Sequence, residues 1–275
     1  MRLLVAHTTR FIYSAKVIET YMELRVRPRD DARQRCLVFD LGIEPESRVA
    51  SYRDGFQNWV HYLNHLAPHD RVVVTSRSLV ETGVPAEGVV DGFPEDFLQF
   101  RSPVENVAGV RRIAERIRPA GRASAEELEA ALDALALDIN HRFEYQPEST
   151  GVYTGVAEVL KLRRGVCQDF AHLYVAVGRA MGIPTRYVSG YIVPGGERRG
   201  TAASHAWAEA WVPGRGWLGY DPTNPVRVGP QHIAVAVGRD YHDVAPTRGV
   251  YKGRAGEEME VEVQITTDPE VGRVG

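Results

Sequence analysis

The stretch "RRGVCQDFAHL", residues 163–173, places one of the two cysteines of the 275-residue chain at the beginning of an apolar run with helical spacing. If a helix begins near Cys167, the unpaired backbone N–H groups of its first turn surround the sulfur, and their partial positive charge favours the thiolate. An inert core thiol is the ordinary alternative for a cysteine in apolar surroundings. The first question is therefore whether Cys167 packs or reacts.

A reactive cysteine needs a base from elsewhere in the chain. His172 lies five residues further along the same predicted helix, about 140° around the axis, so it cannot face the thiol and is interpreted as a surface or second-layer residue. His205 is better placed, because it opens the predicted strand "HAWAEAWV" shortly after the glycine-rich loop "GGERRG". Asp221 ends the next predicted strand, "WLGYD", where its carboxylate could hold the imidazole in one tautomer.

The loop between these two strands decides whether His205 and Asp221 can meet. A four-residue loop would place Asp221 on the opposite face of the hairpin from His205. A three-residue loop at 213–215, with Gly216 as a bulge residue, pairs Val212 with Gly216 and makes the two side chains diagonal neighbours on one face. The flanking glycines favour the second register, so the sequence predicts this bulge.

Each of the three residues has a structural explanation when it is taken alone. A single cysteine is more often buried than nucleophilic, a histidine before an aromatic strand is usually structural, and an aspartate before proline often only shapes a turn. The combination is different, because a cysteine at a helix start, a histidine at a strand start and an aspartate at the end of the partner strand suit nucleophilic catalysis.

The rest of the chain divides into a strand-rich part and a helical part. Residues up to about 83 alternate with period two, as in "YMELRVRP" and "CLVFDL", between turn-rich segments. After a stretch with several prolines and glycines near residues 83–102, the apolar spacing becomes helical. The sequence therefore predicts an α+β protein with a β-rich domain at residues 1–90 and a catalytic domain at residues 91–275.

Two capping signals mark predicted helix starts in the second part. Ser102 and Glu105 have the spacing of a capping box, with a proline between them at the first helical position. Ser124 and Glu127 repeat the same spacing ahead of a leucine-rich run. Each pair predicts a helix that begins directly after its serine.

Composition limits the partners and the compartment. The formal net charge is -3 and the isoelectric point is near 6.3, so no basic surface for nucleic acid is expected. No segment has the length of a membrane span or of a signal peptide. Two cysteines in a chain of this length fit a reducing compartment, and we expect a cytoplasmic protein.

These motifs carry a resemblance to a known family. "RRGVCQDFAHLYVAVGRAMGIPTRYVSGY" followed by "SHAWAEAWVPGRGWLGYDPTNP" resembles the core of the transglutaminase-like superfamily, in which Cys, His and Asp occur in that order on a papain-like scaffold. Residues 1–80 resemble the β-rich amino-terminal region of the bacterial members, and "HIAVAVGRDYHDVAPTRGVY" resembles their carboxy-terminal signature. The resemblance implies a β-sandwich-like first domain and a nucleophile helix packed on an antiparallel sheet.

By that resemblance, Cys167 is the nucleophile, His205 the general base and acid, and Asp221 its orienting partner. The backbone N–H of Cys167 is one expected oxyanion donor. The tryptophan that supplies the second donor in eukaryotic transglutaminases is missing, because residues 101–166 contain none. Gln168 and Tyr153 are weak candidates for that second donor.

Several neighbouring residues have weaker assignments. Asp169 is expected to make structural hydrogen bonds in the first turn of the helix, where an acid stabilises the positive end. Trp207 and Tyr220, together with Trp211 and Trp217, are candidates for the walls of a cleft, although aromatic residues in strands are more often core. Cys36 alternates within a strand and is expected to be an inert core thiol.

No metal and no cofactor are expected. The histidine pairs His61/His65 and His232/His242 lack the ligand spacing and the carboxylate neighbours of a metal site. A calcium loop is also missing from the sequence.

Three functions remain open. A cysteine-type hydrolase that acts on a peptide or protein substrate, with water as acceptor, is favoured. The alternatives are a transglutaminase or other amine acyltransferase, and a non-catalytic scaffold that binds a partner. The triad does not separate water from amine, because that choice depends on the cleft. The first domain could dock a protein partner, support a homo-oligomer or cover the cleft, and its residues do not decide among these roles.

Overall fold

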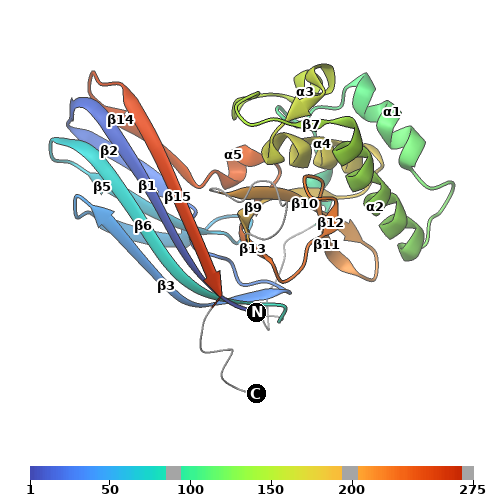
Figure 1. Ribbon diagram of the computed structural model, residues 1–275, viewed down its shortest axis with the longest axis horizontal. Coiled ribbons are helices and arrows are strands. Elements are labelled where there is room, and N and C mark those ends of the chain that lie inside the picture. Colours follow the sequence, from blue (N-terminus) through green and yellow to red (C-terminus); the bar gives the residue numbers. More distant parts are fainter. Residues whose placement is uncertain (85–93, 194–203, 268–275) are drawn as a thin grey trace.

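The computed structural model of the chain describes residues 1–84, 94–193 and 204–267. The predicted "GGERRG" loop and residues 85–93 of the predicted domain boundary lie outside the described residues. Within the described ranges, one part is built from two β-sheets and the other from a sheet covered by helices (Figure 1).

Two antiparallel four-stranded sheets form the first part (Figure 1). Their strand orders are β15-β1-β6-β3 and β14-β2-β5-β4. The bounds are β1 Arg2–Val17, β2 Glu19–Leu24, β3 Gln34–Glu44, β4 Arg48–Arg53, β5 Trp59–His65, β6 His69–Thr82, β14 Thr247–Lys252 and β15 Glu257–Thr267.

The alternating sequence pattern explains why these segments pack as a sandwich. Side chains of β1 and β2 alternate between buried and more exposed positions, as expected for strands with one face on a core. The buried faces of the two sheets share one apolar cluster, which includes Phe11, Met22, Leu24, Leu63 and Val72. The β-sandwich-like first domain predicted from the sequence is confirmed.

The predicted domain division is wrong at the end of the chain. The strands β14 and β15 belong to the segment that was assigned to residues 91–275, but β14 pairs with β2 and β15 pairs with β1. The sandwich is therefore completed by residues 247–267. A strand can pair with the edge of a sheet even when it is distant from that sheet in the sequence. The alternating pattern of a strand predicts the strand but does not identify the strand with which it pairs.

The second part is a five-stranded antiparallel sheet with a central helix on one face (Figure 1). The strand order is β12-β11-β10-β9-β13, and α4 packs on β9 and β10. The strands are β9 Thr185–Ile192, β10 His205–Val212, β11 Gly216–Asp221, β12 Val226–Arg227 and β13 His232–Gly238. This arrangement confirms the predicted nucleophile helix on an antiparallel sheet.

The remaining elements are short or surround α4. They are η1 Pro94–Leu98, α1 Ala108–Ile117, α2 Ala125–Arg142, α3 Val156–Leu162, α4 Cys167–Ala180, α5 Tyr241–Val244, and the parallel pair β7 Glu144–Tyr145 and β8 Arg164–Gly165. The helices α1, α2 and α3 all contact α4. This covering explains why the apolar residues of α4 are buried around most of its circumference.

One predicted helix start is confirmed and the other is wrong. Ser124 and Glu127 form the predicted capping box of α2. By contrast, α1 begins only at Ala108, because Arg101 and Val104 close a tight turn by backbone pairing. The Glu105 carboxylate accepts a hydrogen bond from Ala157 N–H, 2.9 Å away, so it satisfies the first turn of α3 instead.

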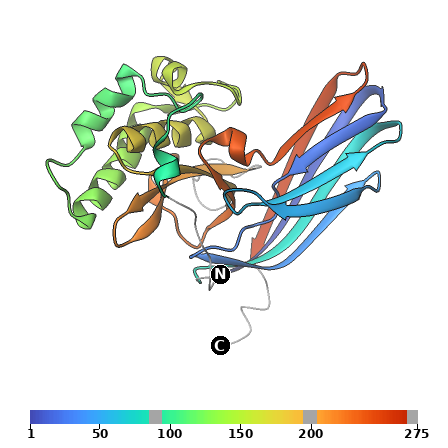
Figure 2. The same ribbon diagram turned by 180° about the vertical axis from the view of Figure 1, so that it is seen from behind.

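The two parts lie side by side in both views (Figures 1 and 2) and share an apolar interface. Leu3, Val5 and Val80 of the sandwich pack with Tyr191 and Ile233 of the second sheet. These side chains are all buried. The interface therefore anchors β9 and β13, which flank the end of the sheet where the candidate site lies. In the residues that the structure describes, no helix is long and apolar enough to cross a membrane.

Candidate active site

The first turn of α4 presents Cys167. Its preceding residue, Val166, is the helix N-cap, and the Cys167 side chain is half-buried. The Asp169 carboxylate accepts hydrogen bonds from Val166 N–H at 2.8 Å and from the Thr150 hydroxyl at 2.6 Å. Burial raises the pKa of Asp169, and these two hydrogen bonds oppose the rise. The structural role expected for Asp169 is confirmed, and Cys167 begins the helix as predicted.

The β10–β11 hairpin has the register that brings the predicted base and carboxylate together. Val212 pairs with Gly216, and Ala208 pairs with Tyr220. Gly214 and Gly216 have φ values of 76° and 80°, a region that side chains with a Cβ rarely adopt. The predicted three-residue loop with a glycine bulge is therefore confirmed, and His205 and the end of β11 lie on one face.

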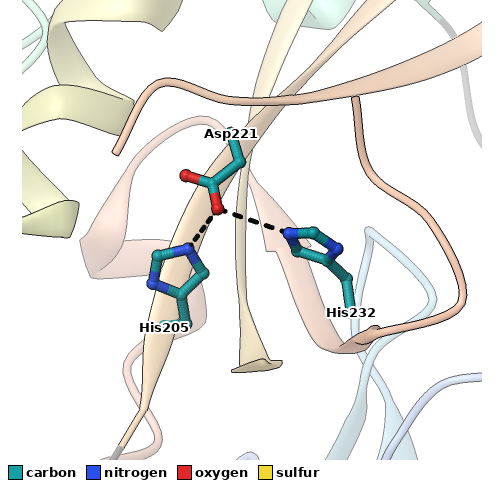
Figure 3. Close-up of side chains that lie close together, drawn as sticks. All are labelled: His205, Asp221 and His232. Carbon is teal, nitrogen blue, oxygen red and sulfur yellow. Dashed lines mark hydrogen bonds and ion pairs between the residues drawn. The ribbon is translucent and has the colours of Figure 1, made fainter. Parts of the chain in front are cut away.

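His205 and Asp221 make a short hydrogen bond inside the protein (Figure 3). His205 Nε2 lies 2.7 Å from Asp221 Oδ2, and both side chains are 0% exposed. The turn after β11 satisfies the carboxylate further, since the backbone N–H groups of Thr223 and Asn224 donate to Oδ1. The Asn224 side-chain amide donates to Oδ2 at 2.9 Å. Asp221 is thus a buried carboxylate with a full set of donors.

The two groups shift each other's pKa in opposite directions. Burial alone would lower the pKa of His205, but the charge and hydrogen bond of Asp221, with the Cys167 thiol, raise it. Burial alone would raise the pKa of Asp221, but His205 and the other donors hold it well below its usual range. At neutral pH the pair therefore favours an imidazolium beside a carboxylate.

Cys167 is the third group near this pair. Its thiol is among the causes of the raised His205 pKa, through both a hydrogen bond and charge. Within the described ranges, the Nδ1 atom of His205 is buried and has no well-aligned hydrogen-bond partner. The ring nitrogen that Asp221 does not use is therefore available to a thiol, and such catalytic contacts often align only when substrate binds.

His232 joins the site, although the sequence motifs did not single it out. Its Nε2 atom lies 3.3 Å from Asp221 Oδ2 (Figure 3). The expectation that His232 lacks a carboxylate neighbour is wrong, and the ligand atoms of His205, Asp221 and His232 lie within 4.8 Å of one another. The 2.7 Å separation of His205 and Asp221 is that of a hydrogen bond. The signal that could have found His232 is the strand order, because β13 begins at the sheet end where β11 stops.

The other histidines have structural partners. His172 is buried, not at the surface, and its Nε2 accepts a hydrogen bond from Tyr241 N–H at 3.1 Å. Burial lowers the pKa of His172 to about 3, so the ring is neutral at physiological pH. His242 lies beside Asp240, with 3.2 Å between Nδ1 and Oδ1, and is therefore not paired with His232.

The candidate oxyanion and cleft residues are dispersed. The Gln168 amide donates to the Val152 carbonyl at 3.0 Å, so its side chain is already engaged. Tyr153 is 78% exposed. Trp207 and Tyr220 are buried in the core, and Trp207 lines a cavity of about 230 Å³ together with His232.

A larger groove lies between the sandwich and the loop before α3. Its volume is about 560 Å³, and Val152, Tyr153 and Tyr241 line it on the catalytic side, with Tyr251 and Met259 on the sandwich side. The hydrogen bond between Gln168 and Val152 connects this groove with the residue that follows Cys167. One wall of the groove is therefore hydrogen-bonded to the first turn of α4.

Cys36 differs from Cys167 in its surroundings. The thiol is half-buried rather than in the core as predicted, and burial raises its pKa to about 11. A protonated thiol is a weak nucleophile. Cys36 therefore serves as an internal control for reactivity.

The comparisons with known proteins agree with the geometry. The family model described as "Transglutaminase-like superfamily" matches residues 111–222, and "Bacterial transglutaminase-like N-terminal region" matches residues 3–81. An uncharacterized protein of Mycobacterium leprae is 36% identical over 96% of this chain and 98% of its own length. A protein-glutamine gamma-glutamyltransferase of Pseudomonas aeruginosa is 38% identical over 42% of this chain and 19% of that enzyme.

A solved structure supports the fold over the whole chain. The crystal structure of a candidate cysteine protease from Cytophaga hutchinsonii superposes with a TM-score of 0.74 and is 23% identical. The match covers 98% of this chain and 92% of that one. Both the sandwich and the helical part are included in this superposition, so the two parts occur together in both proteins.

Proposed function

The chain belongs to the transglutaminase-like superfamily, and from that premise we propose that it catalyses cysteine-dependent acyl transfer on amide bonds of a peptide or protein substrate. In this proposal Cys167 is the nucleophile, His205 the general base and acid, and Asp221 the residue that orients His205. One observation carries the proposal: the buried 2.7 Å hydrogen bond between His205 and Asp221, beside a cysteine at a helix start.

The proposed reaction proceeds through a thioester. The Cys167 thiolate attacks the substrate carbonyl carbon, and the resulting oxyanion is stabilised by the Cys167 backbone N–H at the start of α4. The C–N bond then breaks as imidazolium His205 gives its proton to the leaving amine. Neutral His205 next removes a proton from the acceptor, which attacks the thioester and releases the thiolate.

Asp221 makes this sequence of proton transfers feasible. The carboxylate keeps the Nε2 side of the His205 ring occupied, so that Nδ1 exchanges the proton with the thiol and the substrate. Because its own pKa is held low, Asp221 remains charged and stabilises the imidazolium without taking its proton.

We propose that the substrate enters through the groove of about 560 Å³ that Tyr153 and Tyr241 line. The groove adjoins the loop that is bonded to Gln168. Aromatic walls of this kind suit an extended peptide with apolar side chains near the reacting amide. Hydrolysis, with water as acceptor, is the proposed outcome.

Amine transfer is the second candidate, because the relative of 38% identity from Pseudomonas aeruginosa is a protein-glutamine gamma-glutamyltransferase. An assay that separates the two uses a casein digest as acyl donor, with and without dansylcadaverine. Hydrolysis predicts released ammonia or new amino termini and no dansyl label, whereas transfer predicts labelled peptides. Both products should disappear in Cys167→Ser and persist in Cys36→Ser. Activity that remains in Cys167→Ser would refute the assignment of Cys167 as the nucleophile.

A further inference from the structure

His232 lies at the same end of the catalytic sheet as His205 and Asp221. Because β9, β10, β11 and β13 run antiparallel to their neighbours, the first residues of β10 and β13 and the last residue of β11 share that end. The loop after β11 returns the chain to this end, and Figure 3 shows the Asp221 carboxylate between the two imidazole rings. The His232 side chain is 3% exposed.

The neighbours of His232 fix the position of its proton. The backbone N–H of Gly229 donates to His232 Nδ1 at 3.4 Å, and a ring nitrogen that accepts a hydrogen bond carries no proton. In the neutral ring the proton is then on Nε2, which lies 3.3 Å from Asp221 Oδ2. His232 is therefore a donor to the same oxygen that accepts from His205.

Packing holds the His232 ring in place. The Trp207 ring meets it edge to face, with 5.3 Å between the ring centroids. Gly190 makes room for this contact, because a Cβ at that position would lie 2.6 Å from the Trp207 ring and 2.1 Å from the Ile233 carbonyl oxygen. A ring that is fixed by packing can orient its hydrogen-bond partner.

Charged groups from several segments lie near His232. Asp221 and His205 face it from β11 and β10. Asp31 and Arg33, from the segment before β3, line the cavity that His232 shares with Trp207. Asp221 is thus the acid in hydrogen-bonding contact with the His232 ring.

We propose that His232 is a positioning residue whose Nε2–H holds the Asp221 carboxylate in the orientation in which Oδ2 accepts the hydrogen bond from His205 Nε2–H. Its consequence for catalysis rests on the proposed function, whereas its effect on His205 does not. Loss of the donor removes one of the hydrogen bonds that restrain Oδ2. A carboxylate that is less well aligned stabilises the His205 imidazolium less.

The first test follows the histidine rings directly. In protein labelled with 15N-histidine, the neutral wild-type His232 ring should carry its proton on Nε2 and not on Nδ1. In His232→Phe, which keeps an aromatic ring against Trp207, His205 should lose its proton at a pH at least about half a unit lower. His232→Gln restores an N–H donor and should return most of the shift, and His65→Phe, remote from the site, should leave His205 unchanged.

The outcomes separate this inference from the proposed function. A neutral His232 ring with its proton on Nδ1 in the wild type, or an unchanged His205 titration in a folded His232→Phe, overturns the positioning role. The wild-type tautomer does not depend on any variant folding. Alkylation of Cys167 at neutral pH should fall at least about threefold in His232→Phe and recover in His232→Gln. If wild-type Cys167 is alkylated no faster than Cys36, the proposed nucleophile is refuted. The positioning role of His232 is then still tested by the 15N-histidine measurements.

Discussion

The hydrogen bonds of Asp221 fix the geometry of the candidate site. The Asp221 carboxylate accepts from two backbone N–H groups, one amide and two imidazoles. A buried carboxylate without partners would be expected to take up a proton, and these donors explain why its pKa is held low instead. The charge of Asp221 is therefore retained inside the protein, where it acts on His205.

Replacement of that charge should abolish most of the activity without loss of the fold. In Asp221→Asn we expect kcat to fall by about 10³- to 10⁴-fold, because the imidazolium loses its counter-charge and the ring loses its fixed tautomer. Steady-state kinetics on the amide substrate found in the acyl-donor assay would measure the loss. Asp133→Asn, at an ion pair on the surface, is the matched control, and a loss of less than tenfold in Asp221→Asn would argue against the assigned role.

At the residue scale, His205 and Asp221 were predictable and His232 was not. The first two belong to one hairpin, so the loop length alone decides whether they share a face. His232 reaches Asp221 only because the loop after β11 crosses two strands, and the strand order of a sheet is not encoded in period-two alternation. The candidate cleft residue Trp207 had a buried position that its neighbours in the sequence did not reveal, since it depends on the space left by Gly190.

At the element scale, the β10–β11 hairpin transmits its turn geometry to the site. The positive φ of Gly216 belongs to the bulge that sets the phase of the whole strand up to Asp221. A different loop would turn the carboxylate to the opposite face. The hairpin turn thus helps to position the candidate site, although it lies several residues from His205 and Asp221.

Gly216→Ala tests that dependence. A side chain in the left-handed region should lower the free energy of unfolding by about 1–2 kcal/mol, as measured by urea denaturation, and it should slow Cys167 alkylation if the register shifts. Gly55→Ala has no atom within 4 Å of the added Cβ and no positive φ, so it should change stability by less than about 0.5 kcal/mol. Equal stabilities of the two variants would contradict the proposed strain at the bulge.

The helix starts show what local sequence can and cannot determine. Ser124 and Glu127 satisfy each other's backbone groups within one turn, so their signal is complete in the sequence. Glu105 has an equally good local signal but binds the first turn of α3. A capping motif therefore predicts the helix only when no distant N–H group competes for its carboxylate.

At the scale of the whole molecule, the chain leaves the sandwich, forms the helical part that holds the candidate site, and returns to the sandwich. The pairing of β15 with β1 extends from Leu3 to Tyr13, so the last described strand is held along most of the first. The sequence predicted both strands but not their pairing, because antiparallel partners far apart in the chain carry no mutual signal. This return leaves the first and last described strands paired in the sandwich, with the helical part beside it (Figure 2).

The interface between the two parts contains a buried histidine that should make stability depend on pH. His7 contacts the Tyr191 hydroxyl at 2.7 Å and is 3% exposed. Burial lowers its pKa from 6.5 to about 4. The unfolded chain therefore binds a proton at a higher pH than the folded chain, so this contribution to stability is complete above pH 6.5 and is lost as the pH falls toward 4.

The expected size of the effect is up to about 3 kcal/mol. Urea denaturation of the wild type and of His7→Gln at several pH values between 7 and 4 would measure it. The difference in unfolding free energy between the two proteins should shift in favour of the glutamine variant as the pH falls. A difference that stays constant over this range would mean that His7 does not couple the interface to pH.

The central claim is that Cys167 reacts because His205 and Asp221 activate it. The most direct measurement is the pH dependence of iodoacetamide alkylation at Cys167 in wild type and His205→Ala, with site occupancy read by mass spectrometry. Since the raised pKa of His205 keeps the imidazolium through neutrality, we predict fast alkylation of Cys167 at pH 7, no modification of Cys36, and a sharply lower rate in the variant. Equal rates in the two proteins, or a Cys167 that reacts only after denaturation, would contradict the claim and make "RRGVCQDFAHL" a core helix.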